Sequence, residues 1–291
     1  SEASAYEALQ LAQSSIRKKV KNNEFESACE LSYSTSLSLL QKNRVSVASQ
    51  LLKLCVGVLK ETHTEESDIW IERIVELHKA HTTAMQSLSG AEALRLERLQ
   101  KDWLLEAISW SSDLGTVKYG HSKLHELCGH QYWKLQGLEE DSDERGELQC
   151  DAVQHMALAE QPNMILEWLK TLKKPTEEET ALGHTCPPAV RDGLLTRANL
   201  VFLSLENLRD AYALVKGYTE IEERDIQMLQ NSYTKKDDGL APSHLMFNTM
   251  LLRICQNDTR TGPLFQWLIR SFKRELDKLP GNLSILTTKI G

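Results

Sequence analysis

Residues 103–137 read WLLEAISWSSDLGTVKYGHSKLHELCGHQYWKLQG, and this stretch decides the fold class. It predicts two helices joined by a short connection between Gly115 and Gly120. On the first helix Trp103, Ala107 and Trp110 recur at i, i+4 and i+7, which places them on one face. The second helix has a stripe with the same periodicity, formed by His125, Gly129, Tyr132 and Trp133. A glycine costs about 1 kcal/mol inside a helix, so its central place indicates close helix packing. The stretch therefore predicts packed helices and not a catalytic centre.

The helical period continues through most of the chain. Asn22-Asn23 and the polar loop 63–67 separate the first periodic segments, and the acidic stretch 138–147 and the proline-containing stretch 173–188 are predicted loops. Residues 235–239 (KKDDG) form a turn signal that can close a short β-hairpin near 231–241. The predicted helices cover residues 4–20, 25–40, 44–60, 69–85, 91–113, 148–160, 162–172, 189–205, 207–217, 218–230, 242–256, 263–278 and 282–290, besides the pair above.

Helices of this length with short connections predict an all-α fold, an α-solenoid of stacked helix hairpins. A recurring aromatic-Glu setting, Tyr6-Glu7-Ala8 and then Phe25-Glu26-Ser27-Ala28, favours tetratricopeptide-like pairs with degenerate repeats. We expect an N-terminal part over 1–172 and a C-terminal part over 173–291. A helical protein of two domains divided at 173–188 is the alternative.

Charge is unevenly distributed along the sequence. The net charge is −7, which disfavours nucleic acid or an anionic membrane as a partner of the whole molecule. Residues 1–60 nevertheless carry 8 Lys and Arg against 5 Asp and Glu. The basic run Arg17-Lys18-Lys19-Val20-Lys21 is therefore either a solvated helix face or a docking surface for an acidic partner.

The six cysteines are scattered, without a CxxC pair, as expected for a reduced intracellular protein. No apolar run approaches the roughly 18 residues that a membrane span needs. Cytosol is the expected location, with no direct membrane insertion. Since the sequence begins at Ser1 and not at Met, we expect that further residues precede it in the full protein.

Catalytic and cofactor signatures are missing from the sequence, which lacks GxxxxGK[ST], GxSxG, HExxH and GxGxxG. His121 and His125 have an i, i+4 spacing that can hold a metal, but Cys128 and His130 lie on other sides of the helix. We interpret these side chains as packing residues and expect no enzyme activity, no cofactor and no metal. A metal-dependent enzyme built on His121 and His125 is the alternative.

The last third of the chain is dense in large apolar residues. Core packing explains most of them, but a terminal repeat has only one neighbour, so surplus apolar surface there can bind a partner. The candidates for such a contact are Met246, Met250, Leu251, Leu264, Phe265 and Leu268.

Several ordered motifs resemble one family, the Golgi-to-ER traffic protein four family, which is the scaffold subunit of tail-anchored membrane-protein targeting. The spacing from Tyr6-Glu7-Ala8-x-Gln10 to Phe25 resembles two successive helices of that family near its N-terminus. The other matching motifs are Leu124-His125-x-x-x-Gly129-x-x-Tyr132-Trp133, Ala152-x-x-His155, Glu167-Trp168, Asn207-Leu208-Arg209-Asp210-Ala211 and Cys255-Gln256 followed by Leu264-Phe265.

The resemblance implies a scaffold without catalytic activity. In the family, the N-terminal half docks on an ArsA-like targeting ATPase, and the C-terminal half binds a ubiquitin-like-domain protein, or a BAG-type scaffold in animals. A co-chaperone that carries the tail anchor joins through that partner. The resemblance also implies that one family helix precedes Ser1 and that the chain stops within the family's terminal helix.

When the family's ATPase-docking surface is carried onto this sequence, the candidate residues are Tyr6, Gln10, Arg17, Lys18, Lys19 and Lys21. The chain departs from the family in two places. Residues 41–46 stand where the family has a Gly-rich turn, and Gln50 and Gly57 stand where it has acidic residues that touch the ATPase. A helical-repeat adaptor in another trafficking or quality-control complex is the alternative function.

Overall fold

The computed structural model describes residues 2–172, 190–221, 243–257 and 262–277. By its internal contacts the chain divides into two compact units, unit 1 (Ser1–Leu138) and unit 2 (Glu139–Gly291). The predicted division of function between 1–172 and 173–291 stays a prediction. Every regular element within the described ranges is a helix, so the predicted all-α, solenoid-like fold class is confirmed. The predicted hairpin near 231–241 lies outside the described residues, as does the predicted helix 282–290.

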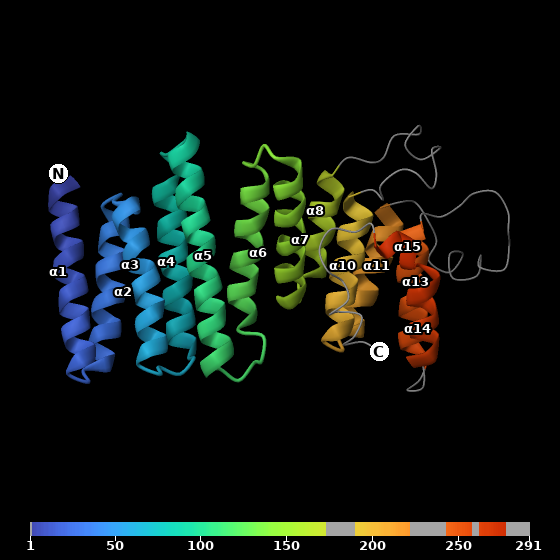
Figure 1. Cartoon of the computed structure of the whole chain (residues 1–291), viewed down its shortest axis with the longest axis horizontal. Helices are drawn as coiled ribbons and strands as arrows, with labels where there is room; N and C mark the ends of the chain where they lie inside the picture. Colours follow the sequence, from blue (N-terminus) through green and yellow to red (C-terminus); the bar gives the residue numbers. More distant parts are fainter. Residues whose placement is uncertain (1, 173–189, 222–242, 258–261, 278–291) are drawn as a thin grey trace. The chain divides into compact units, whose positions relative to one another are not determined.

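Unit 1 consists of antiparallel helices that follow one another along the chain (Figure 1). Helix α2 packs on α3 and on α4, α3 packs on α5, and α5 packs on α6, so consecutive hairpins stack side by side. Helix α1 covers α2 and α3 at the N-terminal end of this stack. The bounds are α1 (Glu2–Lys21), α2 (Phe25–Gln41), α3 (Val45–Glu61), α4 (Asp68–Met85), α5 (Gly90–Leu114) and α6 (Ser122–Gln136).

Unit 2 repeats the same principle with shorter helices. Helix α7 packs on α10, α8 packs on α11, and both α10 and α11 pack on α13. The bounds are α7 (Ser142–Leu158), α8 (Pro162–Thr171), α10 (Val190–Ser204), α11 (Leu208–Ile221), α13 (Ser243–Gln256), α14 (Gly262–Ser271) and α15 (Lys273–Leu276). Pro162 opens α8 at a position where the missing N–H costs nothing. The Asn207 side chain caps α11 by accepting a 3.1 Å hydrogen bond from the Asp210 N–H, as predicted.

Several helix boundaries differ from the prediction. Helix α11 (Leu208–Ile221) continues through the boundary predicted between residues 217 and 218. Helix α4 begins at Asp68 itself, after Ser67 as its N-cap residue. Helix α7 begins at Ser142, inside the predicted loop, because the Asp141 carboxylate accepts hydrogen bonds from the N–H groups of Asp143 and Glu144. Acidic side chains in a first turn also interact favourably with the helix dipole. The predicted helix 263–278 is broken between α14 and α15.

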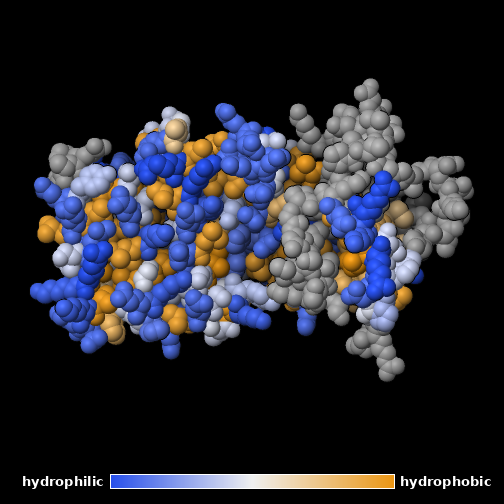
Figure 2. Space-filling view, in the orientation of Figure 1, coloured by the Kyte–Doolittle hydropathy of each residue, from blue (hydrophilic) through white to orange (hydrophobic). Residues whose placement is uncertain are grey.

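Amphipathic helices build the core of unit 1. Figure 2 shows one of its faces, where hydrophilic side chains alternate with apolar ones, as amphipathic helices require. Inside, Ile16, Leu51 and Leu59 are fully buried. Among the described helices, none has the length and apolar character that crossing a membrane requires.

Helix α10 in unit 2 is buried on every side, from Arg191 to Leu203. Several of its polar side chains form hydrogen bonds inside the unit. Asn199 Nδ2 donates to Asn248 Oδ1 at 2.8 Å, and Asn248 Nδ2 donates to Thr196 Oγ1 at 2.8 Å. These buried hydrogen bonds fix the register of α10 against α13, although Asn199 Oδ1 itself has no hydrogen-bond partner among the described residues.

Candidate functional site

The stretch that decides the fold forms the interior of unit 1 and is not a chemical site. Trp103 is 1% exposed, and Ala107 and Trp110 are fully buried on α5, as predicted. The Trp110 indole N–H donates a hydrogen bond of 2.9 Å to the Thr64 carbonyl oxygen, in the loop between α3 and α4. On α6, His125, Gly129 and Tyr132 are buried as well. These side chains support the predicted packing role of both stripes.

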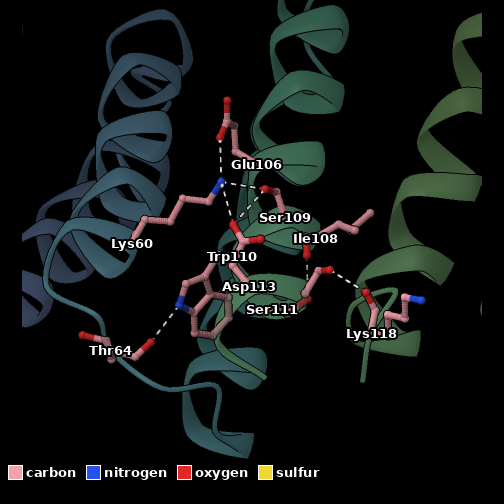
Figure 3. A network of polar contacts seen from close by, with 10 residues as sticks. Lys60, Thr64, Glu106, Ile108, Ser109, Trp110, Ser111, Asp113 and Lys118 are labelled. Atoms are coloured by element: carbon pink, nitrogen blue, oxygen red, sulfur yellow. Dashed lines mark hydrogen bonds and ion pairs between the residues drawn. The ribbon is translucent and has the colours of Figure 1, made fainter. Parts of the chain in front are cut away.

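A polar network joins α3 to α5 beside this core (Figure 3). The Lys60 ammonium lies 2.7 Å from Ser109 Oγ and 3.4 Å from Glu106 Oε2. The Asp113 carboxylate lies 3.8 Å from the same ammonium. Because these groups are partly exposed, the network adds little to the free energy of unfolding. Its main effect is to orient α3 relative to α5.

The four histidine and cysteine side chains that suggested a metal site do not converge. His121 is the N-cap residue of α6, and its Nδ1 accepts from the Lys123 N–H at 3.1 Å. His125 Nε2 lies 2.7 Å from the Tyr119 carbonyl oxygen, and burial lowers the pKa of this imidazole. Cys128 is buried, whereas His130 is exposed. Among the described residues, no group of three or more His, Cys, Asp or Glu side chains could hold a metal ion.

The predicted ATPase-docking residues lie on α1. Its opposite face, with Leu9, Ala12 and Ile16, is buried against the rest of unit 1. The open face has a row at i, i+4, i+11 and i+15, which lies within about 60° around the helix. We call this row the α1 stripe; it consists of Tyr6, Gln10, Arg17 and Lys21, all exposed.

The other two lysines of the basic run differ from each other. Lys18 is exposed beside the α1 stripe, and, like Arg17 and Lys21, it has no ion pair within the described residues. Lys19 is half-buried, and its ammonium pairs with Glu24 at 3.1 Å, which lowers the pKa of that carboxyl. Sequence reasoning missed Leu11, which is 70% exposed on the same helix. Leu11 lies outside the stripe of Leu9, Ala12 and Ile16, and this position could have identified it as exposed from the sequence alone.

Helix α3 carries the two positions that depart from the family pattern. Gln50 and Gly57 are both exposed, and Lys53 is exposed between them on the same helix face. At these three positions the exposed face of α3 has a neutral and basic character and no acidic side chain.

The predicted partner-binding residues of unit 2 separate into three groups by exposure. Leu251 and Leu268 are fully buried and Phe265 is 2% exposed, so these three belong to the core of the unit. Met246 and Met250 are half-buried. Leu264, in contrast, is 55% exposed on α14.

Trp267, which was not among the candidates, is 49% exposed one turn after Leu264. The i, i+3 spacing puts both side chains on one side of α14, whereas Phe265 and Leu268 face inward with the same spacing. We call Leu264 and Trp267 the α14 apolar pair. Since the two i, i+3 patterns look alike, the sequence could not tell which of them is the open one.

Comparison with known proteins places these features in a family. The family model described as Golgi to ER traffic protein 4 matches residues 22–291. Protein GET4 of Arabidopsis thaliana is 23% identical to the chain over 295 residues, which cover 95% of this chain and 81% of that protein. A crystal structure of Get4 from C. therm. superposes with a TM-score of 0.60 at 20% identity, covering 98% of this chain and 81% of the other, and thus shares the fold. The chain belongs to the Golgi to ER traffic protein 4 family.

Proposed function

We propose that this chain is a non-enzymatic adaptor in the delivery of tail-anchored membrane proteins to the endoplasmic reticulum. In this proposal unit 1 docks on an ArsA-like targeting ATPase through the α1 stripe. Unit 2 binds a ubiquitin-like-domain protein, or a BAG-type scaffold, and that partner brings the co-chaperone that carries the tail anchor. The chain itself works in the cytosol, where it holds its partners without inserting into a membrane.

The observation that carries the proposal is the different chemistry of the two exposed surfaces in a member of this family. The α1 stripe combines an aromatic side chain with cations that have no ion pair among the described residues. Charges of this kind steer and orient an acidic partner. The α14 apolar pair exposes a leucine and a tryptophan, and tryptophan is among the residue types that contribute most to interfaces. Two surfaces that attract different partners are what an adaptor needs.

The resemblance implies acidic residues on α3 that this chain lacks, and this limits which surface of unit 1 can bind the ATPase through charge. Gln50, Lys53 and Gly57 offer no negative charge to a basic site on the ATPase. The proposal therefore assigns ATPase binding to the α1 stripe and Lys18, and assigns no electrostatic contact to the exposed face of α3.

The ATPase-binding part is tested by charge reversal. Replacing Arg17 and Lys21 by Glu is expected to weaken binding of the ArsA-like ATPase by at least roughly tenfold at low salt. The effect should shrink at high salt because exposed charges are screened. The matched control reverses the charge of Lys79 and Lys118, two exposed lysines of unit 1 outside α1. It should leave the affinity for the ATPase unchanged. Equal affinities for the two double variants would contradict the proposal.

The second surface is tested on α14. Replacing Trp267 by Ser is expected to weaken capture of the ubiquitin-like partner, because an aromatic anchor is lost from the interface. Pro263→Ser changes another exposed residue of α14 and is the control. Aspartate at Phe265 or Leu251 would not test binding, since both side chains are buried and the unit would lose stability. Full capture by the folded Trp267→Ser variant would remove the α14 apolar pair from the proposal.

A further inference from the structure

We infer that a pocket at the end of unit 1 is an anchor site, which takes one large apolar side chain of the ATPase together with a carboxylate beside it. This inference rests on the proposed function and extends its ATPase-binding surface from the α1 stripe onto the α2–α3 turn. The pocket has a volume of about 270 Å³. Typical small-molecule sites begin at about 300 Å³, so the pocket suits a side chain better than a ligand of drug size.

The pocket lies where several helix ends of unit 1 meet. The N-terminal end of α1, the α2–α3 turn and the α4–α5 turn are at the same end of the unit (Figure 1). The floor is apolar. It is formed by Val45, Ala84 and Leu96, which are 4%, 5% and 1% exposed and belong to one cluster of the core. A partner's apolar side chain would be removed from water on contact with this floor.

The rim of the pocket carries residues that are common at interfaces. Tyr6 is 46% exposed and Leu88 is 37% exposed, and both line the pocket. Tyr6 is also the first residue of the α1 stripe, so the pocket and the stripe form one continuous surface. Tyrosine and arginine are enriched among the residues that dominate binding energy.

Arg44 supplies the charge at the pocket. Its neighbour Arg95 is already engaged, because its guanidinium donates to Glu92 Oε1 at 2.7 Å and to Ser46 Oγ at 3.1 Å. Arg44 lines the pocket and forms no ion pair with any described residue. Glu92 also lines the pocket, but its carboxylate is paired with Arg95. Arg44 is therefore the charged lining residue without an ion pair among the described residues, and its guanidinium complements a partner's carboxylate.

The turn holds Arg44 in place before any partner arrives. Asn43 has a left-handed backbone with φ 56°, a conformation that asparagine tolerates. The Asn43 N–H donates to the Leu40 carbonyl at 2.8 Å, and the Arg44 N–H donates to the Leu39 carbonyl at 2.9 Å. Since the backbone is satisfied and fixed, a contact with Arg44 costs only the ordering of its side chain.

The first test changes the charge. Arg44→Glu is expected to weaken binding of the ArsA-like ATPase by roughly tenfold, because a hydrogen-bonded charge pair is replaced by repulsion. Lys42→Glu makes the same charge change two residues away on the same turn, at an exposed position that does not line the pocket. This control should lower affinity by less than about twofold at moderate salt, because exposed charges outside the contact are screened.

The second test fills the pocket without changing charge. Ser87 lines it, whereas the adjacent exposed Gln86 does not. Ser87→Phe is expected to reduce ATPase affinity several-fold, and Gln86→Phe should not. Thermal unfolding of each variant identifies any loss of fold, and both positions are exposed, so neither change enters the core.

The outcomes separate this inference from the proposed function. If reversal of Arg17 and Lys21 weakens binding while Arg44→Glu and Ser87→Phe equal their controls, the anchor pocket is wrong and the adaptor function stands. If the unchanged chain does not bind the ATPase at all, both are wrong. Loss of affinity in both pocket variants, with their controls unaffected, supports the anchor site.

Discussion

The indole N–H of Trp110, a fully buried residue of α5, donates a 2.9 Å hydrogen bond to the carbonyl oxygen of Thr64 in the loop between α3 and α4. This one bond connects the middle of unit 1 to the turn between two preceding helices. It gives a buried tryptophan its polar partner and a loop carbonyl its donor.

Replacing Trp110 by Phe is therefore expected to destabilise unit 1 by about 1–3 kcal/mol. The change removes the donor, leaves the Thr64 carbonyl unsatisfied and opens a small cavity. Urea unfolding followed by circular dichroism measures it. Trp70→Phe, at a half-buried position of α4 that keeps an aromatic ring beside Arg73, is the control and should cost less. Equal effects of the two substitutions would contradict this account of Trp110.

Gly57 lies within α3, at a position with open space for a side chain. A Cβ atom added there meets nothing within 4 Å. Gly57→Ala is expected to stabilise the chain by roughly 0.5–1 kcal/mol, because alanine loses less backbone entropy on forming a helix. Thermal unfolding should show a higher midpoint. Gly146, in α7, has equally open surroundings and offers a second test of the same reasoning. A lower midpoint for both alanine variants would show that these sites are not open.

Alanine in place of Gly120, just before α6, should lower stability, whereas alanine at Gly57 should raise it. Its φ is +93°, and an added Cβ would lie 2.9 Å from the Ile108 carbonyl oxygen. Gly120→Ala is expected to destabilise unit 1 by about 1–3 kcal/mol, from backbone strain and the close approach of α5. Gly90, with φ +70° but open space around it, separates the two causes. Gly90→Ala should cost less, and an equal cost would show that strain alone decides.

Burial of His81 makes the free energy of unfolding depend on pH. It is fully buried on α4, its Nε2 lies 3.1 Å from Ser49 Oγ, and burial lowers the pKa of its imidazole to about 4. An unfolded histidine has a pKa of about 6.5, so the unfolded chain takes up the proton first. His81 therefore adds no pH dependence above about 6.5 and destabilises the fold as the pH falls from there toward about 4.

His81→Gln should make this acid-side loss shallower by up to about 1.4 kcal/mol per pH unit. Urea unfolding at a series of pH values between 4.5 and 7.5 measures the slope. His63→Asn is the control, because His63 is exposed and has a left-handed backbone that asparagine also adopts. An unchanged slope in His81→Gln would mean that another group causes the acid destabilisation.

Periodicity was sufficient to predict the helices because burial on one face repeats every 3.6 residues in any stacked helical fold. The stripe of Trp103, Ala107 and Trp110 is buried as expected. The start of α7 was missed because its first turns are exposed and acidic, and a cap such as Asp141 leaves no apolar period. The family resemblance and the basic run named all four residues of the α1 stripe as docking candidates, but sequence reasoning could not separate Leu264 from Phe265.

The sequence by itself therefore determined the fold class, the order of the helices and the family, since each depends on local periodicity and on motifs in order along the chain. Only the tertiary structure decided which apolar residues of α14 face outward and which face the core. It also brought Tyr6, Arg44 and Leu88 to one pocket from three distant parts of the chain. The reason is physical: a helix pattern records that one side is buried, whereas the partner of that side and the space left between helix ends depend on how the hairpins stack.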